Sequence, residues 1–342
     1  MTVNVTKPAL NIREKLAELD KPSGIAGEAM LRADSVQEQR NLIGAGRKNL
    51  IINGGMQVSQ RGDYTTATAA SHNNYYLDRW RFESGLSQTV QDTGFKQKVV
   101  VTSGGTNIVG VRQHIEDKTY NRLLGKTVTL SAKVTSNSSD ARICSYADGW
   151  RVGTAHTGGG SEETLTLTYT VPSSLSVAAL ILEVAITGSS YSNVAISTGD
   201  YLEISEAQLE LGSVATDFEH RSYGEELALC QRYCYVFDGT QNQDLMLFGV
   251  GSGTGTANCT HLHPVEMRST PTLTTTAMST FSSYSFGAQS TGGTPTTFGV
   301  STAMSNKNWF YIDVVCSGNI TGTGVMIRAN GNATKLTFDA EL

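Results

Sequence analysis

From Asn49 onward, apolar and polar residues alternate along the chain with a period of two. In the segment 126–134, four alternate side chains fall on one face: Val128, Leu130, Ala132 and Val134. In the segment 163–171, four more share one face, with mainly threonines on the other: Leu165, Leu167, Tyr169 and Val171. Strict alternation is typical of half-buried antiparallel strands. Further short strand-like segments follow one another to about Leu211, separated by Gly, Ser and Asn clusters. This pattern predicts an antiparallel β-sandwich of jelly-roll type over 49–221.

One helix interrupts the strand pattern. Ser222 and Glu225 have the spacing of a capping box, which predicts a connecting helix over 222–236. On that helix one face would carry three small or apolar side chains: Leu227, Cys230 and Cys234. Alternation then resumes in segments such as DLMLFGVG, NWFYIDVVCSG and KLTFDAEL. We therefore expect a second, smaller β-sandwich over 237–342.

Residues 1–48 have a helical pattern instead. Pro8 stands near the start of a helix in which three apolar residues recur at i, i+4 and i+7: Ile12, Leu16 and Leu19. A second short helix is indicated by the capping box of Ser35 and Glu38. Helices this short are marginally stable alone. We predict that residues 1–48 form a docking arm whose apolar stripe packs on a partner or on copies of itself.

Composition excludes several classes of function. The 342 residues carry 26 basic and 31 acidic side chains, a formal net charge of −5, so no basic face for nucleic acid or anionic lipid is predicted. No apolar run approaches the roughly 18 residues of a membrane span, and the N-terminus lacks the apolar segment of a signal peptide. The five cysteines are widely spread, which favours buried, reduced thiols over a disulfide framework: Cys144, Cys230, Cys234, Cys259 and Cys316.

The common enzyme and cofactor motifs are absent, including GxSxG, HExxH, the P-loop and GxGxxG in a strand-then-helix context. Glycoside hydrolysis needs two carboxylates across a cleft. Candidates exist in Glu162, Glu163, Glu203, Glu206 and Glu210, but Glu203 and Glu210 lie in strand-like stretches and are interpreted as solvated side chains. The sequence therefore predicts neither an enzyme nor a bound cofactor.

Metal binding is the sharpest local pattern. Cys259, His261 and His263 alternate, so a thiol and two imidazoles would share one face of a strand. In a three-fold assembly, His261 and His263 near the axis could supply six nitrogens. The alternative is that Cys259 packs inward and the histidines lie at a strand end before Pro264. Structural sites usually draw ligands from separate segments, so this remains a weak candidate.

Sugar binding uses aromatic faces with hydrogen-bonding groups nearby. Trp80 and Trp309 lie in strand-like, apolar surroundings and are predicted to be core residues. Trp150 differs, because it stands in the Gly-rich segment SYADGWRVGTAHTGGG, predicted as a loop after a strand. Its polar and aromatic neighbours are Tyr146, Asp148 and Arg151. We hypothesise a ligand-binding platform at Trp150, Tyr146 and Arg151, against the alternative that the tryptophan packs on its own domain.

Several stretches resemble phage tail-fibre proteins. They are NLIINGGMQVSQRG (49–62), YYLDRW (75–80), QLELGSVATDFEHRSYGEELALCQRYCYVF (208–237) and MRSTPTL (267–273), while KPALNIREKLAELD (7–20) resembles the leader of fibre or adaptor proteins from short-tailed phages of marine and cyanobacterial hosts. The intervening 85–200 resembles carbohydrate-binding modules in general pattern only.

This resemblance implies a tail-fibre component of the virion, made in the host cytoplasm. It would form a homotrimer, dock on the tail or an adaptor through residues 1–48, and bind host surface polysaccharide without cutting it. The chain has no repetitive shaft, so a short fibre or a proximal segment is implied. The alternative is a connector or decoration protein of the virion that carries another fibre or adhesin and has no ligand of its own. A depolymerase is the enzymatic alternative.

Overall fold

The computed structural model describes residues 48–176, 179–239, 244–253, 255–286, 290–291, 293–301, 304–318, 324–330 and 334–341. The elements below lie in one compact unit, Leu50–Leu342. Residues 1–47 of the predicted docking arm, with Ile12, Leu16 and Leu19, lie outside the described residues. The described chain is mainly β with antiparallel sheets, as the alternation predicts.

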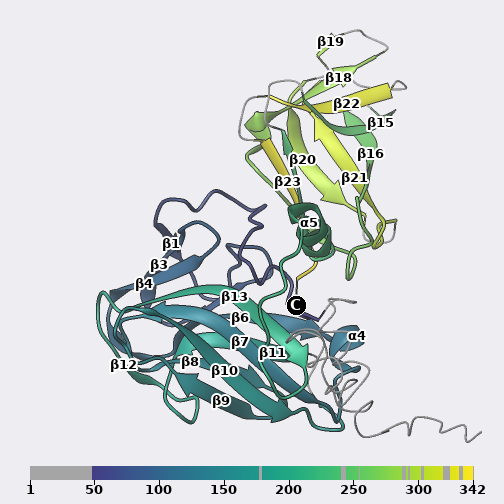
Figure 1. The fold of residues 1–342 in the computed structure, drawn as a ribbon. Coiled ribbons are helices and arrows are strands. Elements are labelled where there is room, and N and C mark those ends of the chain that lie inside the picture. Colours follow the sequence, from purple (N-terminus) through teal and green to yellow (C-terminus); the bar gives the residue numbers. More distant parts are fainter. Residues whose placement is uncertain are drawn as a thin grey trace, which may run out of the picture. The chain divides into compact units, whose positions relative to one another are not determined.

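Two antiparallel sheets form the first sandwich (Figure 1). The six-stranded sheet has the order β1 (Thr68–Ala70), β3 (Ser87–Asp92), β4 (Gln97–Ser103), β13 (Tyr201–Leu211), β7 (Thr127–Ser136) and β10 (Glu162–Thr170). The five-stranded sheet has the order β2 (Arg81–Ser84), β6 (Val109–Glu116), β11 (Ala179–Ile186), β8 (Ala141–Tyr146) and β9 (Trp150–Ala155). A two-stranded sheet pairs β5 (Gly105–Asn107) with β12 (Val194–Ile196), and a short helix, α4 (Asp117–Tyr120), follows β6.

Strands β7 and β10 confirm the predicted alternation. They pair so that Leu167 lies opposite Leu130, and both side chains are buried in the core cluster of this sandwich. The threonines between the apolar positions form a ladder on the opposite face, where the Thr129 and Thr168 hydroxyls are 2.9 Å apart. Burial of each leucine contributes about 1.5–3 kcal/mol, so the alternating pattern fixes which face of the sheet packs inward.

The connecting helix is shorter than predicted. Helix α5 spans Tyr223–Gln231, and its capping box is confirmed because the Ser222 hydroxyl accepts from the backbone N–H of Glu225. The predicted end at residue 236 is wrong, since strand β14 (Cys234–Gly239) begins before it. The backbone of β14 pairs with β23 (Thr334–Asp339), and this ladder replaces further helical hydrogen bonds. Cys230 is buried from the helix, whereas Cys234 is buried from the strand.

A three-stranded and a seven-stranded sheet follow in the described part of the chain. The smaller has the order β14, β23 and β17 (Thr272–Thr275). The larger has the order β19 (Ser290–Thr291), β18 (Phe281–Ser285), β22 (Gly324–Ala329), β15 (Leu245–Gly253), β16 (Thr256–Leu262), β21 (Trp309–Cys316) and β20 (Pro295–Val300). A 3-10 turn at Met278–Thr280 precedes β18. Phe310, Ile327 and Phe338 from both sheets share a second hydrophobic core.

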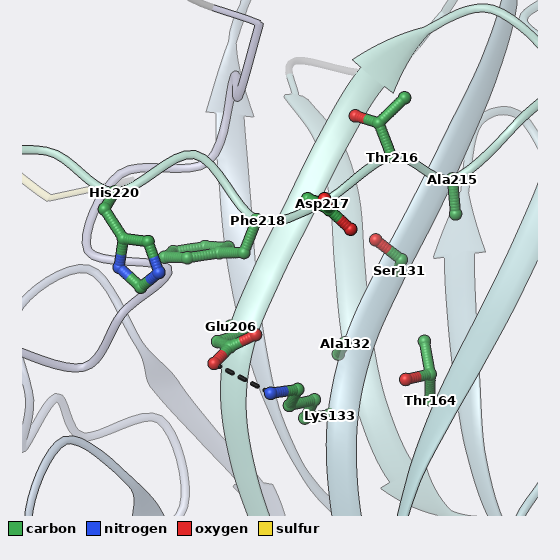
Figure 2. A pocket seen from close by; sticks show the side chains of 10 residues that line it. All are labelled: Ser131, Ala132, Lys133, Thr164, Glu206, Ala215, Thr216, Asp217, Phe218 and His220. Atoms are coloured by element: carbon green, nitrogen blue, oxygen red, sulfur yellow. Dashed lines mark hydrogen bonds and ion pairs between the residues drawn. The ribbon is translucent and has the colours of Figure 1, made fainter. Parts of the chain in front are cut away.

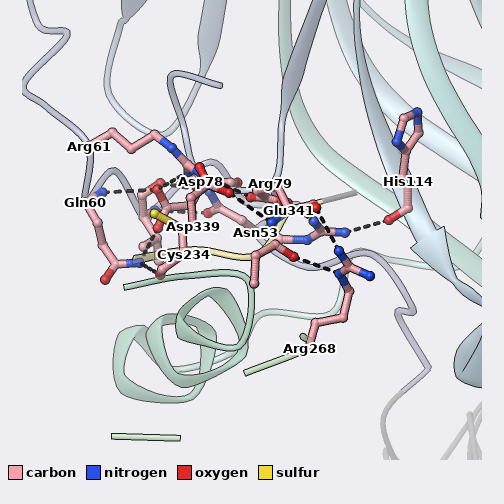
Figure 3. A network of polar contacts seen from close by, with 12 residues as sticks. Asn53, Gln60, Arg61, Asp78, Arg79, His114, Cys234, Arg268, Asp339 and Glu341 are labelled. Atoms are coloured by element: carbon pink, nitrogen blue, oxygen red, sulfur yellow. Dashed lines mark hydrogen bonds and ion pairs between the residues drawn. The ribbon is translucent and has the colours of Figure 1, made fainter. Parts of the chain in front are cut away.

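A network of charged side chains links the chain's C-terminal end to the first sandwich (Figure 3). Arg61 reaches Asp339 at 2.9 Å and Asp78 at 3.3 Å. Arg79, which is buried, pairs with Glu341. Burial raises the pKa of Asp78 to about 6, although Arg61 and its hydrogen bonds with Gln60 act in the opposite direction. The Arg61–Asp339 and Arg79–Glu341 pairs join residues separated by more than 250 positions in sequence.

The two tryptophans predicted as core residues differ in outcome. Trp80 is buried, as predicted, and its indole N–H donates to the backbone carbonyl of Asn53 at 2.8 Å. It lies directly before β2 rather than within a strand. Trp309 does begin β21, but it is half-buried, so its assignment to the core is wrong. Phe310 and Ile312 occupy the inward positions of that strand, and alternation turns Trp309 the other way. The five cysteines are all buried and free, as predicted.

Candidate functional site

Trp150 is not on a loop, as the sequence suggested, but is the first residue of β9. It pairs with Tyr146 at the end of β8. Between them Asp148 adopts a φ of 56° and Gly149 a φ of 145°, which form a tight turn. The Asp148 carboxylate accepts from the backbone N–H of Ser176 at 2.9 Å and from its hydroxyl at 2.8 Å. The turn that presents Trp150 is therefore held from a second segment.

The indole of Trp150 lies in a cluster of three aromatic rings. Its ring is stacked on Tyr191 with a centroid distance of 3.4 Å and an interplanar angle of 11°. Tyr146 approaches it edge-on at 5.3 Å. All three side chains are half-buried, so the cluster keeps part of its aromatic surface exposed to solvent. Such a surface of fixed rings is suited to packing against an apolar or C–H-rich ligand face.

Two charged residues fix the position of Tyr191. Its hydroxyl donates to Glu183 at 2.9 Å and accepts from Arg112 at 2.9 Å. The backbone of Tyr191 has a φ of 53°, a conformation that costs of order 1–3 kcal/mol for a residue other than glycine. Ring stacking and the two hydrogen bonds hold the residue in that conformation. Burial, with Glu183 close by, raises the pKa of Tyr191.

Arg112 is the cation at the centre of this arrangement. Its guanidinium lies 3.0 Å from Glu183 and 3.1 Å from Glu83, and 5.7 Å from the ring centroid of Trp150. Burial raises the pKa of Glu183 to about 7, while Arg112 and the Tyr191 hydroxyl act to lower it. The face thus combines three aromatic rings with a cation and two carboxylates. They come from β2, β6, β8, β9 and β11 and from the segment after β11.

Arg151 does not belong to this cluster. Its guanidinium lies 5.0 Å from the ring of Tyr169 in β10, and it donates to the carbonyls of Ala147 and Gly149 at 2.9 and 3.0 Å. Neighbouring residues of a strand point to opposite faces, so Trp150 and Arg151 diverge once β9 is a strand. The hypothesised platform therefore retains Trp150 and Tyr146 and loses Arg151.

The sequence interpretation missed Tyr191, Arg112 and Glu183. Tyr191 had a usable signal, because it lies in the segment GSSYSN and resembles Trp150 in being an aromatic residue within a Gly/Ser-rich segment. Arg112 and Glu183 had none, since each is a charged residue at an alternating strand position. Their proximity follows from the register of β6 and β11, in which Glu183 lies directly opposite Arg112.

The weak metal candidate occupies an aromatic environment. Cys259 is buried in the core of the second β region. The His261 ring stacks on Phe338 at 4.8 Å, and the rings of His261 and His263 are 5.7 Å apart. Burial lowers the pKa of both histidines to about 4, so they are neutral at pH 7. Within the described residues, no group of three or more His, Cys, Asp or Glu side chains has the geometry of a metal site.

The candidate carboxylates take part in ion pairs and local hydrogen bonds. Glu162 and Glu203 flank Lys96 at 2.9 and 3.5 Å, and Glu163 accepts from the backbone N–H of Thr157. Glu210 is buried, so its interpretation as a solvated residue is wrong. It accepts from the backbone N–H and the hydroxyl of Thr216, because the chain after β13 folds back over it. Glu206 pairs with Lys133 at 2.9 Å.

No helix in the described part of the chain is long and apolar enough to cross a membrane. No protein-family model matches the chain, and no curated protein matches it.

Among solved structures, the chain is similar to carbohydrate-binding modules. The structure of TmCBM61 in complex with β-1,4-galactotriose is 13% identical, with a TM-score of 0.30, over 48% of this chain and 100% of that one. A CBM4 structure is 16% identical, with a TM-score of 0.28, over 47% and 98%. The tandem CBM22-1–CBM22-2 domain of Paenibacillus barcinonensis Xyn10C is 12% identical, with a TM-score of 0.28, over 82% and 98%. Similarity at this level assigns no ligand to the chain.

Proposed function

We propose that this chain is a non-catalytic, glycan-binding tail-fibre component of a phage virion. Its ligand would be a host surface polysaccharide, bound on the outer face of the five-stranded sheet. The observation that carries the proposal is the ring stack of Trp150 on Tyr191, which Arg112 and Glu183 hold in place.

The chemistry of this face suits a sugar ring. A pyranose presents C–H groups on its faces and hydroxyls around its rim. The exposed parts of the two stacked rings offer a surface for the C–H groups. The carboxylate of Glu83, which is 24% exposed, can accept from sugar hydroxyls. Arg112 and Glu183 are buried and position the Tyr191 ring through its hydroxyl. Because the polar groups already pair with one another, the face is preorganised before the ligand arrives.

The placement on a virion is supported by the sequence resemblance described above. Docking through residues 1–48 and assembly as a homotrimer through Ile12, Leu16 and Leu19 belong to the same proposal. Three linked copies of a weak site would raise the overall affinity by roughly 10²–10⁴-fold. Sedimentation or native mass measurement of the full-length protein tests this part, and a monomer at micromolar concentration would count against it.

The binding site is tested with two matched tryptophan variants. Trp150 and Trp309 each begin a strand and are each half-buried. We expect Trp150→Ala to lower binding to an array of bacterial surface polysaccharides, and adsorption to host cells, by about tenfold or more, as truncation of an aromatic anchor does. Trp309→Ala should bind like the unchanged protein. Equal binding by Trp150→Ala and the unchanged protein would exclude this face as the glycan site.

Incubation with the same polysaccharides followed by a reducing-end assay tests the depolymerase alternative.

One observation favours the connector alternative. Phe248 and Val250 of β15 are 54% and 57% exposed, and Phe286, directly after β18, is 46% exposed. The rings of Phe248 and Phe286 lie 6.1 Å apart. Exposed apolar groups of this kind mark protein contacts. If Trp150→Ala leaves adsorption unchanged while Phe248→Ser prevents incorporation into particles, the connector function is the better description.

A further inference from the structure

A cavity of about 530 Å³ lies on the outer face of the six-stranded sheet (Figure 2). Strands β7 and β10 contribute Ser131 and Thr164, β13 contributes Glu206, and the segment 215–220 forms the remaining wall. The Trp150 cluster belongs to the other sheet, so the two sites use different faces of the first sandwich. The volume lies within the roughly 300–1,000 Å³ of small-molecule sites.

The wall of this cavity is held by two buried side chains of β13. The Glu210 carboxylate accepts from the Thr216 backbone N–H at 2.8 Å and from its hydroxyl at 2.7 Å. The Gln208 side chain accepts from the backbone N–H of Glu219 at 2.9 Å and donates to the carbonyl of Thr216 at 3.2 Å. Both Gln208 and Glu210 are buried. The segment 215–220 is therefore fixed at the edge of the cavity by polar contacts.

The strand itself is distorted where it enters the cavity. The register of β13 against β7 shifts between Ser205 and Gln208, which marks a β-bulge, and Glu206 within it has a φ of 48°. Bulges change the direction of a side chain. Here the Glu206 carboxylate lies 2.9 Å from the Lys133 ammonium, at the cavity's edge, and both side chains are about one-third exposed. An ammonium has three donors and a carboxylate about four acceptor positions, so this pair retains capacity for a ligand.

One aromatic ring completes the lining. Phe218 is half-buried, and its ring meets His220 edge-to-face at a centroid distance of 4.9 Å and an angle of 85°. The hydroxyls of Ser131 and Thr164 line the same cavity (Figure 2). A ring with hydroxyls and an ion pair around one half-open cavity suits a pyranose, because the sugar's faces are apolar and its rim is polar.

The charges select among sugars. Glu206, Asp217 and Lys133 line the cavity, and Glu162, outside the lining, lies 3.7 Å from Lys133, so carboxylates outnumber the ammonium here. A ligand carboxylate placed here would be repelled. We propose that this cavity is a second saccharide site, which takes a neutral or amino-substituted sugar ring and rejects uronic acids. The proposal concerns a site separate from Trp150, and it stands whether or not that residue binds glycan.

The test uses two exposed threonines on the same face of β10. Thr164 lines the cavity and Thr170 does not. In the full-length Trp150→Ala protein, which removes the first site, binding of galactose, glucosamine and glucuronic acid is measured by saturation-transfer NMR titration. Adding Thr164→Trp fills the cavity and should weaken galactose and glucosamine by about tenfold or more. Adding Thr170→Trp should leave both affinities within about twofold, since surface changes away from a site have small effects.

Glucuronic acid should bind at least about tenfold more weakly than galactose, because its carboxylate is repelled by Glu206 and Asp217. Three results would overturn the proposal: equal binding by the Thr164→Trp and Thr170→Trp proteins, equal binding of glucuronic acid and galactose, or binding of none of the three sugars. Phe218→Ala gives an independent variant and should reproduce the loss. These outcomes are distinct from a failure of the proposed function, which depends on Trp150 and Trp309 in polysaccharide binding.

Discussion

The ion pair of Arg79 and Glu341 should be a major source of stability where the C-terminal end meets the first sandwich. The Arg79 side chain is 1% exposed and that of Glu341 is 4% exposed. Arg79 also donates to the carbonyl of His114 at 2.5 Å, and its guanidinium lies 3.5 Å from the ring centroid of Tyr233. Glu341→Gln keeps the shape of the side chain but leaves the guanidinium without this carboxylate.

Breaking a buried pair from one side costs about 3–5 kcal/mol, because an uncompensated charge remains buried. We expect the free energy of unfolding of Glu341→Gln to fall by that amount. The matched control is Asp238→Asn, which breaks the 2.9 Å pair with Lys335. Those two side chains are 36% and 31% exposed, so the expected loss is about 1 kcal/mol or less.

Urea unfolding followed by circular dichroism measures both variants. The double variant Arg79→Met with Glu341→Gln should recover part of the loss, because replacing both partners of a buried pair is often close to neutral. A loss below about 1 kcal/mol for Glu341→Gln would refute the reasoning, since this loss is expected only of an exposed pair.

Three further predictions concern pH and packing. The folded-state pKa of His261 is about 4, against 6.5 for an ordinary histidine. The stability that the neutral imidazole contributes is therefore lost as pH falls from 6.5 towards 4. His261→Phe should reduce the change in urea midpoint between pH 7.5 and 5. The pKa of Glu183 is raised from 4.5 to about 7, so the stability that the protonated carboxyl contributes is lost as pH rises across that window. Glu183→Gln should reduce the fall in urea midpoint between pH 5 and 8. An unchanged fall would disprove that Glu183 causes it. At Gly153 an added Cβ would lie 2.4 Å from the Thr166 carbonyl oxygen, so Gly153→Ala should lose about 1–3 kcal/mol in the same assay. Gly159→Ala is the control, because the nearest atom there is 3.6 Å away, and equal losses would contradict the clash.

The strands could be predicted because their signal is local. In β7 and β10 each apolar residue indicates its own face, and no knowledge of the partner strand is needed. The same reasoning misplaced Trp150, although a local signal for the hairpin was present. Asp148 and Gly149 form a dipeptide that favours tight hairpin turns, and residues 147–149 join Tyr146 to Trp150.

The candidate ligand face could not be predicted in the same way because its parts are brought together by strand pairing. Arg112 and Glu183 are 71 positions apart and meet only through the register of β6 with β11. Tyr191 reaches Trp150 from the segment after β11. A sequence pattern gives neither the register of paired strands nor the path of a loop. A charged residue in a strand is therefore interpreted as solvated, although Arg112 is only 8% exposed.

Three of the stretches that resemble tail-fibre proteins, 49–62, 75–80 and 208–237, meet at a structural junction rather than at the candidate ligand face. Asn53 receives the indole N–H of Trp80, and its own backbone N–H donates to Glu226 in α5. Gln60 donates both to Asp78 and to the carbonyl of Cys234 (Figure 3). These residues come from 49–62, 75–80 and 208–237, and their polar groups are largely occupied in joining those segments. A resemblance carried by such residues therefore concerns architecture, whereas the proposed ligand site is built on Trp150 and Tyr191, positioned by Arg112, which lie where the resemblance is weakest.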